Sequence, residues 1–226
     1  MGLQKLAFFD LFGHVLELGV AADLLFKKVD SAVRRAVRKA ERAGVKTEVS
    51  DQLDALKSYY VLHCATRKRH GLPPQPFRFF EELHRQIFAK GLACTILARH
   101  QGLLVAGAVF LQYGRKALFK FGASDLKHQS LRANDLVIWR AIEQFANRGC
   151  TKLHFGRTSK ANAGLRRFKL GWGTREYEIR YFKYDLKHSA FVKDRDNAFG
   201  WHNRLLRLMP TWLARAAGSI LYKRFA

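Results

Sequence analysis

The stretch that decides the fold is a run of three apolar, β-prone segments: ACTILAR (93–99), LLVAGAVFLQY (103–113) and KALFKFGAS (116–124). They are separated only by His100-Gln101-Gly102 and by Gly114-Arg115. Because turns this short join antiparallel neighbours, the three segments predict a meander of three strands.

Helices and strands alternate on both sides of this meander. After it, LVIWRAIEQFANRG (136–149) has apolar residues at helical spacing, and the short buried strand KLHFG (152–156) follows, which predicts a crossover. The other predicted elements, in chain order, are short strands within 6–20, a basic helix from Ser31 to Gly44, a strand at 45–49, a helix that Asp51 caps and Gly71 ends, a helix at 77–91, and a strand at 175–186. This order predicts a mixed sheet with helices on its faces, in the α/β or α+β class.

The composition is that of a folded, strongly basic protein. The 226 residues are 48% apolar, which is ample for a core and too apolar for intrinsic disorder. Lys and Arg total 41 against 18 Asp and Glu, a formal net charge of +23. Such a charge predicts an anionic partner: nucleic acid, an anionic membrane surface or a phosphate-bearing substrate.

The cysteines and the N-terminus exclude several classes of protein. Cys64, Cys94 and Cys150 lie far apart without a CxxC pair, which argues against a disulfide framework or a zinc site and favours a reducing cytoplasm. Residues 6–20 lack the basic start of a signal peptide, and no segment has the apolar length of a membrane span.

Four segments together carry a family resemblance. They are VRRAVRKAERAGV (33–45), TRKRHGLPPQP (66–76), FKFGASD with ANDLVIWRAIEQFANRGC (within 119–150), and FGRTSKANAGLRRFKLGWG (155–173). In order and spacing they resemble the FemAB-type peptidoglycan peptidyltransferases, and more closely the FemAB-like GNAT acyltransferases associated with exosortase and exopolysaccharide loci. The resemblance implies a GNAT-type fold. It also implies acyl or aminoacyl transfer from acyl-CoA or aminoacyl-tRNA to an amine of a cell-envelope or polysaccharide-related acceptor, without a metal or a permanently bound cofactor.

The resemblance covers only part of the family's usual architecture. Its members usually carry two tandem GNAT-like domains, and this chain is similar to the second one. We therefore expect residues 1–26 to be a remnant of a first domain, 27–195 the GNAT domain and 196–226 a basic, amphipathic helical tail. A one-domain descendant, a fragment and a homodimer whose copies complete each other all stay open. Because the 6–20 segment is apolar, we expect it to join the sheet of this domain or to pack against a second copy.

The resemblance places the chemistry at Phe168-Lys169. Attack of an amine on an ester or thioester creates an oxyanion, and a fixed cation beside it lowers the barrier by roughly 3–4 kcal/mol. Lys169 is expected to supply that cation, with Phe168 anchoring it by packing. The alternative is that Lys169 is one more surface lysine.

Four further cations flank this lysine: Arg157, Lys160, Arg166 and Arg167. Since residues 157–169 contain no acid, we expect these side chains to bind a phosphate group of tRNA, CoA or a nucleotide-linked or lipid-linked acceptor.

The segment SLRAND (130–135) occupies the place where CoA-using GNAT enzymes have a glycine-rich pyrophosphate loop, but it has no glycine. Arg132 and Asn134 are candidate phosphate ligands there. The pattern favours a second interpretation, in which Asn134 or Asp135 is an ordinary helix N-cap.

Two histidines and the nucleophiles complete the candidates. His70, at a predicted helix end, is a candidate general base for the amine, although its position favours a partner of the helix dipole. His154 is expected to be a core histidine. No GxSxG motif and no paired cysteine supports covalent catalysis, so direct attack by the acceptor amine is expected.

Three functions remain after this reasoning. The first is a cytoplasmic FemAB-like acyltransferase, which predicts a deep cleft leading to Lys169. The second is a non-catalytic GNAT-derived module that binds RNA or a phosphorylated glycan or lipid through an open basic face. The third is peripheral contact with an anionic membrane, at the inner face, through the tail, where Trp201 and Trp212 stand among apolar and cationic residues.

Overall fold

The computed structural model describes residues 9–192 and 207–225. Its main element is a seven-stranded mixed sheet with the order β2-β3-β4-β5-β6-β1-β7, which confirms the predicted fold class. In chain order the strands are β1 (Phe9–Glu17), β2 (Lys46–Ser50), β3 (Ala93–His100), β4 (Leu103–Tyr113), β5 (Lys116–Ser124), β6 (Lys152–Ser159) and β7 (Arg175–Tyr181). A separate hairpin contains β8 (Lys183–Asp185) and β9 (Ala190–Val192).

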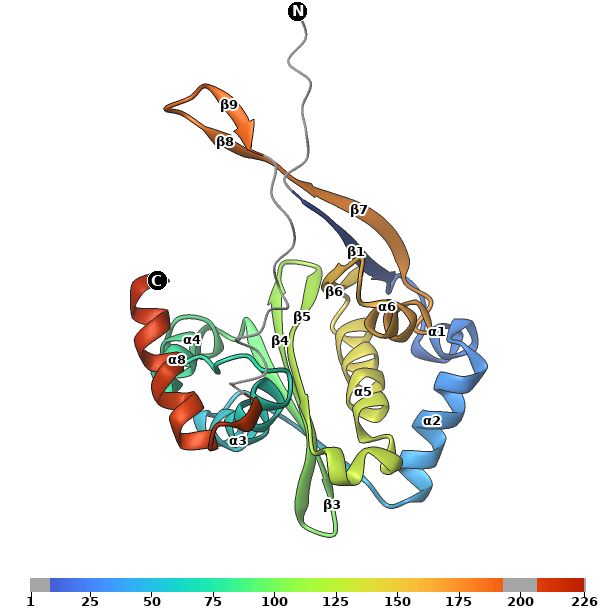
Figure 1. Cartoon of the computed structure of the whole chain (residues 1–226). Coiled ribbons are helices and arrows are strands. Elements are labelled where there is room, and N and C mark those ends of the chain that lie inside the picture. Colours follow the sequence, from blue (N-terminus) through green and yellow to red (C-terminus); the bar gives the residue numbers. More distant parts are fainter. Residues whose placement is uncertain (1–8, 193–206, 226) are drawn as a thin grey trace, which may run out of the picture.

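Helices cover the two faces of the sheet unequally (Figure 1). Helices α3 (Leu53–Arg69), α4 (Phe77–Gln86) and α8 (Thr211–Phe225) lie on one side, with α3 against β3, β4 and β5. On the other side lie α1 (Ala22–Lys28), α2 (Ser31–Arg42), α5 (Ala133–Asn147) and α6 (Ala163–Leu170). Two 3-10 turns, η1 (Phe88–Lys90) and η2 (Leu126–Leu131), precede β3 and α5.

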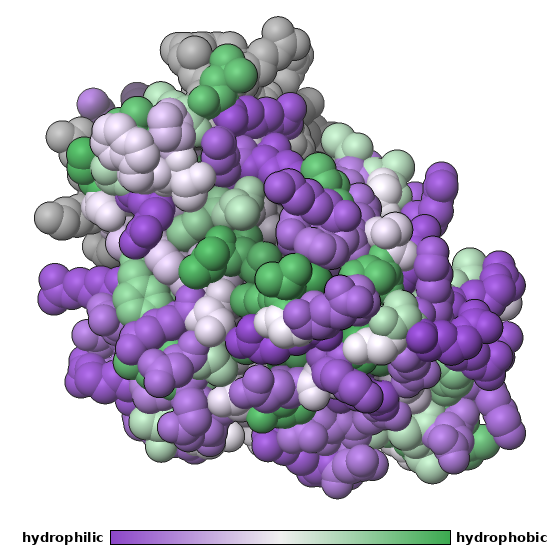
Figure 2. Space-filling view, turned by 90° about the horizontal axis from the view of Figure 1, so that it is seen from below, coloured by the Kyte–Doolittle hydropathy of each residue, from purple (hydrophilic) through white to green (hydrophobic). Residues whose placement is uncertain are grey.

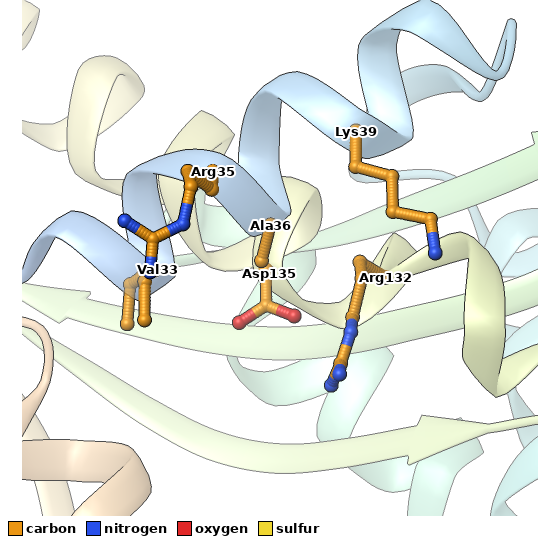
Figure 3. A pocket seen from close by; sticks show the side chains of 7 residues that line it. Val33, Arg35, Ala36, Lys39, Arg132 and Asp135 are labelled. Atoms are coloured by element: carbon orange, nitrogen blue, oxygen red, sulfur yellow. The ribbon is translucent and has the colours of Figure 1, made fainter.

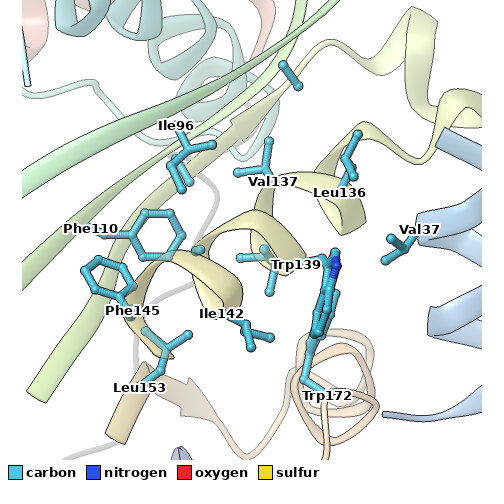
Figure 4. Packing of buried hydrophobic residues seen from close by; sticks show 14 of the residues in the cluster. Val37, Ile96, Phe110, Leu136, Val137, Trp139, Ile142, Phe145, Leu153 and Trp172 are labelled. Atoms are coloured by element: carbon cyan, nitrogen blue, oxygen red, sulfur yellow. The ribbon is translucent and has the colours of Figure 1, made fainter. Parts of the chain in front are cut away.

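Each face of the sheet has its own apolar core. Successive strand residues point to opposite faces, so Phe110 packs with Phe145 and Ile142 of α5, while its neighbour Val109 packs on the α3 side. Figure 4 shows the α5 core, in which Trp139 and Trp172 close the side toward α2. Helix α5 is therefore held on the sheet by buried side chains on both flanks.

The meander forms as predicted. β3, β4 and β5 pair antiparallel, and the β3–β4 turn consists of Gln101 (φ 50°) and Gly102 (φ 79°). Two successive residues with positive φ match the twist of a hairpin, which is why the glycine stands there.

The N-terminal segment joins the sheet of this domain. β1 pairs antiparallel with β6 on one side and with β7 on the other, so that Leu11 faces both Ser159 and Ile179. Of the two arrangements that the apolar segment allowed, the structure has pairing within the sheet. The domain boundary at residue 26 stays a prediction, and the boundary at residue 196 lies outside the described residues.

The sheet is split between β5 and β6. These parallel strands pair only from Lys116–Leu118 to Lys152–His154. Farther along β6, Gly156 has a φ of 69°, and β6 continues paired with β1 alone. The two strands therefore diverge toward their C-terminal ends, and α6, which packs on β6 and β1, begins beyond this opening.

Several predicted boundaries were wrong by a residue or more. Asp30, not Ser31, caps α2 by accepting a bond from Ala32 N–H at 2.7 Å, and Gln52 rather than Asp51 stands at the cap of α3. The predicted strand 175–186 divides into β7 and β8, because β7 pairs with β1 only as far as Tyr181.

Candidate active site

A pocket of about 260 Å³ lies where β5 and β6 diverge. It is lined by Thr66, Arg69 and His70 from α3, Gly107 and Ala108 from β4, Phe119 and Gly122–Ser124 from β5, Asn134, Val137 and Ile138 from α5, and Leu165 and Phe168 from α6. Three of the predicted site residues, His70, Asn134 and Phe168, therefore meet in one cavity. Figure 2 views the molecule from this end and shows apolar side chains at the centre of the face, inside a rim of polar ones.

The pocket continues along the start of α5. A hollow of about 150 Å³ shares Asn134 and Phe168 with it and adds His128, Arg132 and Asp135. A third pocket, of about 340 Å³, shares Arg132 and Asp135 with the second. Figure 3 shows this third pocket, where Arg35 and Lys39 of α2 and Arg132 surround Asp135. One path thus leads from the split in the sheet to a cationic surface.

The start of α5 differs from the prediction and favours anion binding. Helix α5 begins at Ala133, so neither Asn134 nor Asp135 is its N-cap. Arg132 holds the cap position with a φ of 59° and makes no side-chain cap bond. The first N–H groups of a helix have no partner within it, and they attract anions together with the helix dipole. Capping was therefore the wrong interpretation, because the left-handed turn at Arg132 lets the helix start two residues earlier than an Asn134 cap would allow.

Asp135 is the acid closest to this helix start. Burial raises its pKa to about 6, although the nearby Arg132 works in the opposite direction. A carboxyl group that protonates close to neutral pH repels an incoming phosphate less than an ordinary aspartate does.

Lys169 is not a surface lysine. Only 2% of it is exposed, and Nζ donates to the carbonyl oxygens of Gly156 at 3.3 Å and Arg157 at 3.0 Å. Burial lowers its pKa to about 8. Both carbonyls lie on β6 beyond its pairing with β5. The ammonium therefore donates hydrogen bonds to the part of β6 that no longer pairs with β5. Phe168 lines the pocket, whereas Lys169 lines none of the pockets described above.

Sequence reasoning missed a polar cluster beside Lys169, which consists of the buried His14 and its more exposed neighbours Glu176 and Arg166. His14 is fully buried at the bulge of β1, and its Nε2 lies 3.1 Å from Glu176 Oε2, close enough for an ion pair but without the alignment of a hydrogen bond. Burial and the neighbouring Lys169 lower the pKa of His14. Arg166 donates to both Glu176 oxygens, at 2.8 and 2.9 Å. No sequence signal joined these residues, because the apolar segment around His14 is about 150 residues from α6.

The predicted cationic face is largely neutralised. Lys160 lies 3.0 Å from Glu178 and 3.5 Å from Asp10, and Arg166 is paired as described. Arg157 bonds the Tyr181 hydroxyl and stacks over its ring. The expectation of an acid-free surface was wrong because β1 and β7, which flank each other in the sheet, supply the acids.

Arg167 differs from these neighbours. It lines a broad groove between α2 and α6 together with Asp30, Val33 and Leu170. Within 9–192 and 207–225, no acid pairs with it, and unlike Arg157 it has no ring stacked against it, so it can meet an anion.

The two candidate histidines have different places. His70 is the C-cap of α3, and burial together with Arg69 and Arg67 lowers its pKa. This shift disfavours the charged form that a partner of the helix dipole needs, and His70 also lines the pocket. His154 is only half-buried and lines a separate apolar pocket with Tyr113 and Leu118, so it is not a core histidine.

Comparison with solved structures places this geometry among known folds. FemX matches with a TM-score of 0.69 at 17% identity, over 80% of this chain and 64% of FemX. The C-terminal domain of a putative lysylphosphatidylglycerol synthetase from Agrobacterium fabrum matches with a TM-score of 0.57 at 14% identity, over 80% of this chain and 61% of that domain. An aminoglycoside acetyltransferase from an uncultured soil metagenomic sample matches with a TM-score of 0.50 at 16% identity, over 63% of this chain and 96% of its own length.

At these identities the structures show a shared fold, and this chain spans less than two thirds of the first two. No curated protein matches the sequence. The acetyltransferase (GNAT) domain family matches residues 27–178, which is more than half of the chain and contains the split sheet, α5 and α6. The chain belongs to the acetyltransferase (GNAT) domain family.

Proposed function

We propose that this protein transfers an acyl or aminoacyl group from a carrier, acyl-CoA or aminoacyl-tRNA, to an amine of a cell-envelope or polysaccharide-related acceptor. The observation that carries the proposal is the pocket in the β5–β6 split that runs onto the start of α5. The occurrence of FemX and a lysylphosphatidylglycerol synthetase among the similar folds supports the choice of acceptor. A cytoplasmic location stays a prediction.

Donor binding follows from the charges along this path. Either donor carries phosphate, and the N-terminus of α5 offers backbone N–H groups with Arg132 beside them. Arg35 and Lys39 extend the positive charge onto α2. The reactive carbonyl would then reach the apolar part of the path, beside Phe168 and Val137.

The chemistry is a direct displacement. The acceptor amine nitrogen bonds to the donor carbonyl carbon, and the C–S bond of a thioester or the C–O bond of an ester breaks. The amine loses a proton and the leaving sulfur or oxygen gains one. His70 lines the pocket, and burial with Arg69 and Arg67 lowers its pKa, so it is the candidate base. Lys169 is the proposed oxyanion partner: its Nζ donates to the carbonyl oxygens of Gly156 and Arg157, and an ammonium has a third N–H to offer the oxyanion.

Matched variants at the two ends of α5 test the donor site. Arg132→Ala removes the cation at the start of the helix and keeps a side chain on the left-handed backbone, whereas Arg148→Ala removes an exposed cation at its end. We expect Arg132→Ala to weaken binding of acetyl-CoA or of a non-hydrolysable aminoacyl-tRNA about tenfold, and Arg148→Ala to leave it unchanged, by isothermal titration. Equal affinities in both variants would refute the donor site.

Turnover separates the enzyme from the binding module. Labelled acyl-CoA and aminoacyl-tRNA are each mixed with amine acceptors, and product is measured by mass spectrometry. The proposal predicts a covalent amide product with one donor class. Tight donor binding with no product for any acceptor would favour the alternative, a non-catalytic module for RNA or a phosphorylated glycan or lipid.

A further inference from the structure

Helix α8 docks on the domain by one narrow face. Ala214 is 1% exposed, and a Cβ added to Gly218 would lie 2.0 Å from the Pro74 carbonyl oxygen, so the helix backbone touches the 72–76 loop. Arg67 donates to the Tyr222 hydroxyl at 3.4 Å. Ala214, Gly218 and Tyr222 are spaced four residues apart, which puts them on one side of the helix.

The other side of α8 exposes large apolar side chains. The exposed fractions are 67% for Trp212, 38% for Leu213 and 63% for Ile220. Leu208, just before the helix, is 82% exposed. Figure 1 shows α8 on the outside of α3 and α4, away from α2 and α5. A contiguous apolar face of this kind on a surface helix marks an interaction site.

The charge of this segment of the chain favours an anionic partner. The sequence from 197 to 226 contains five Lys and Arg and no acid, and the whole chain carries +23. Two such copies would repel each other, whereas an anionic lipid surface attracts both the cations and the apolar face. Trp212 adds a side chain that prefers the boundary between lipid and water.

The length of α8 fits a helix that lies in the membrane surface. Its 15 residues span about 22 Å, less than the roughly 30 Å hydrocarbon core. Among the described residues, no helix is long and apolar enough to cross a membrane. We propose that the outer face of α8 binds anionic phospholipid bilayers, with Trp212 and Ile220 inserted and the Ala214–Tyr222 side kept on α3.

Vesicle flotation with matched variants tests this proposal. The vesicles contain phosphatidylcholine and phosphatidylglycerol in a three-to-one ratio, with pure phosphatidylcholine vesicles as the uncharged comparison. Trp212→Ser with Ile220→Ser removes the outer apolar face. Leu103→Ser with Tyr113→Ser removes two side chains of 58% and 83% exposure at the hairpin ends of the sheet. Thermal unfolding of each variant checks that it is folded.

We expect the wild-type chain and the Leu103/Tyr113 variant to float with the anionic vesicles, and the α8 variant to bind at least tenfold more weakly. The difference should persist in high salt, which screens the general attraction of a basic protein. Equal binding of both variants would overturn the proposal. Two other results would also overturn it. In the first, the wild type does not bind vesicles and the α8 variant loses self-association, which would make the face a contact between copies. In the second, tRNA protects the face and lipid does not.

Discussion

Replacing Lys169 with methionine perturbs the most unusual charge in the site. The ammonium is buried, and its hydrogen-bond partners among residues 9–192 and 207–225 are two neutral carbonyl oxygens, at 3.3 and 3.0 Å. Its pKa falls from 10.5 to about 8, a difference worth about 3 kcal/mol of folding free energy. In the other direction, removing the donor leaves two part-buried acceptors without their partner, at a cost below the about 1–3 kcal/mol each of fully buried groups. The two effects oppose each other near neutral pH, so the pH dependence is the sharper signature.

The sign follows from proton binding. Between pH 8 and 10.5 the unfolded chain holds a proton on Lys169 that the folded chain has lost. The free energy of unfolding of the wild type should therefore rise with pH in this window, by about 3 kcal/mol in total. Lys169→Met has no such group. Between pH 8 and 10.5 the unfolding free energy of the wild type should therefore rise relative to that of Lys169→Met by the same amount, about 3 kcal/mol.

Urea unfolding of both proteins at several pH values measures this difference. Lys90→Met removes an exposed lysine and serves as the control for the loss of one charge. If the unfolding free energies of the wild type and Lys169→Met change in parallel between pH 8 and 10.5, the pKa of Lys169 is not lowered by burial, and the prediction is refuted.

Three further predictions concern the site. In steady-state kinetics, Lys169→Ala should lower kcat about a hundredfold or more at temperatures where the variant is folded, and Lys169→Arg should restore only part of the lost kcat. If kcat only follows the folded fraction, the lysine is a positioning residue for β6. Burial of Asp135 should lower the unfolding free energy of the wild type by about 3 kcal/mol as pH rises from 3.8 to about 6. Asp135→Asn should abolish this fall and tighten binding of an anionic donor; unchanged pH profiles would contradict the buried carboxyl. Arg166→Ala should lower the melting temperature because Glu176 loses its bidentate partner, whereas Arg167→Ala should raise KM for the anionic substrate at an unchanged melting temperature; the reverse pattern would exchange their roles.

Local patterns in the sequence determined the framework of the fold. The three β-prone segments with short turns fixed the meander, and the helix and strand at 136–156 fixed the crossover, because these elements depend on neighbours in the chain. The order of the four motifs pointed to the GNAT family, which the family match over residues 27–178 confirms.

The surroundings of each candidate residue were decided by tertiary structure. β1 enters between β6 and β7, more than 130 residues away in the chain, and brings Asp10 and His14 to the basic loop. Net charge along 157–169 could not reveal acids that arrive from β1 and β7. For the same reason the sequence could not distinguish a buried lysine from an exposed one.

Backbone geometry decided the rest. The left-handed turn at Arg132 moved the start of α5 and turned an expected cap into an uncapped helix end. The divergence of β5 from β6 created both the pocket and the free carbonyls that Lys169 binds. Sequence patterns report which side chains share a face within one element. Where two strands stop pairing depends on the packing of every element around them, so only the assembled structure determines it.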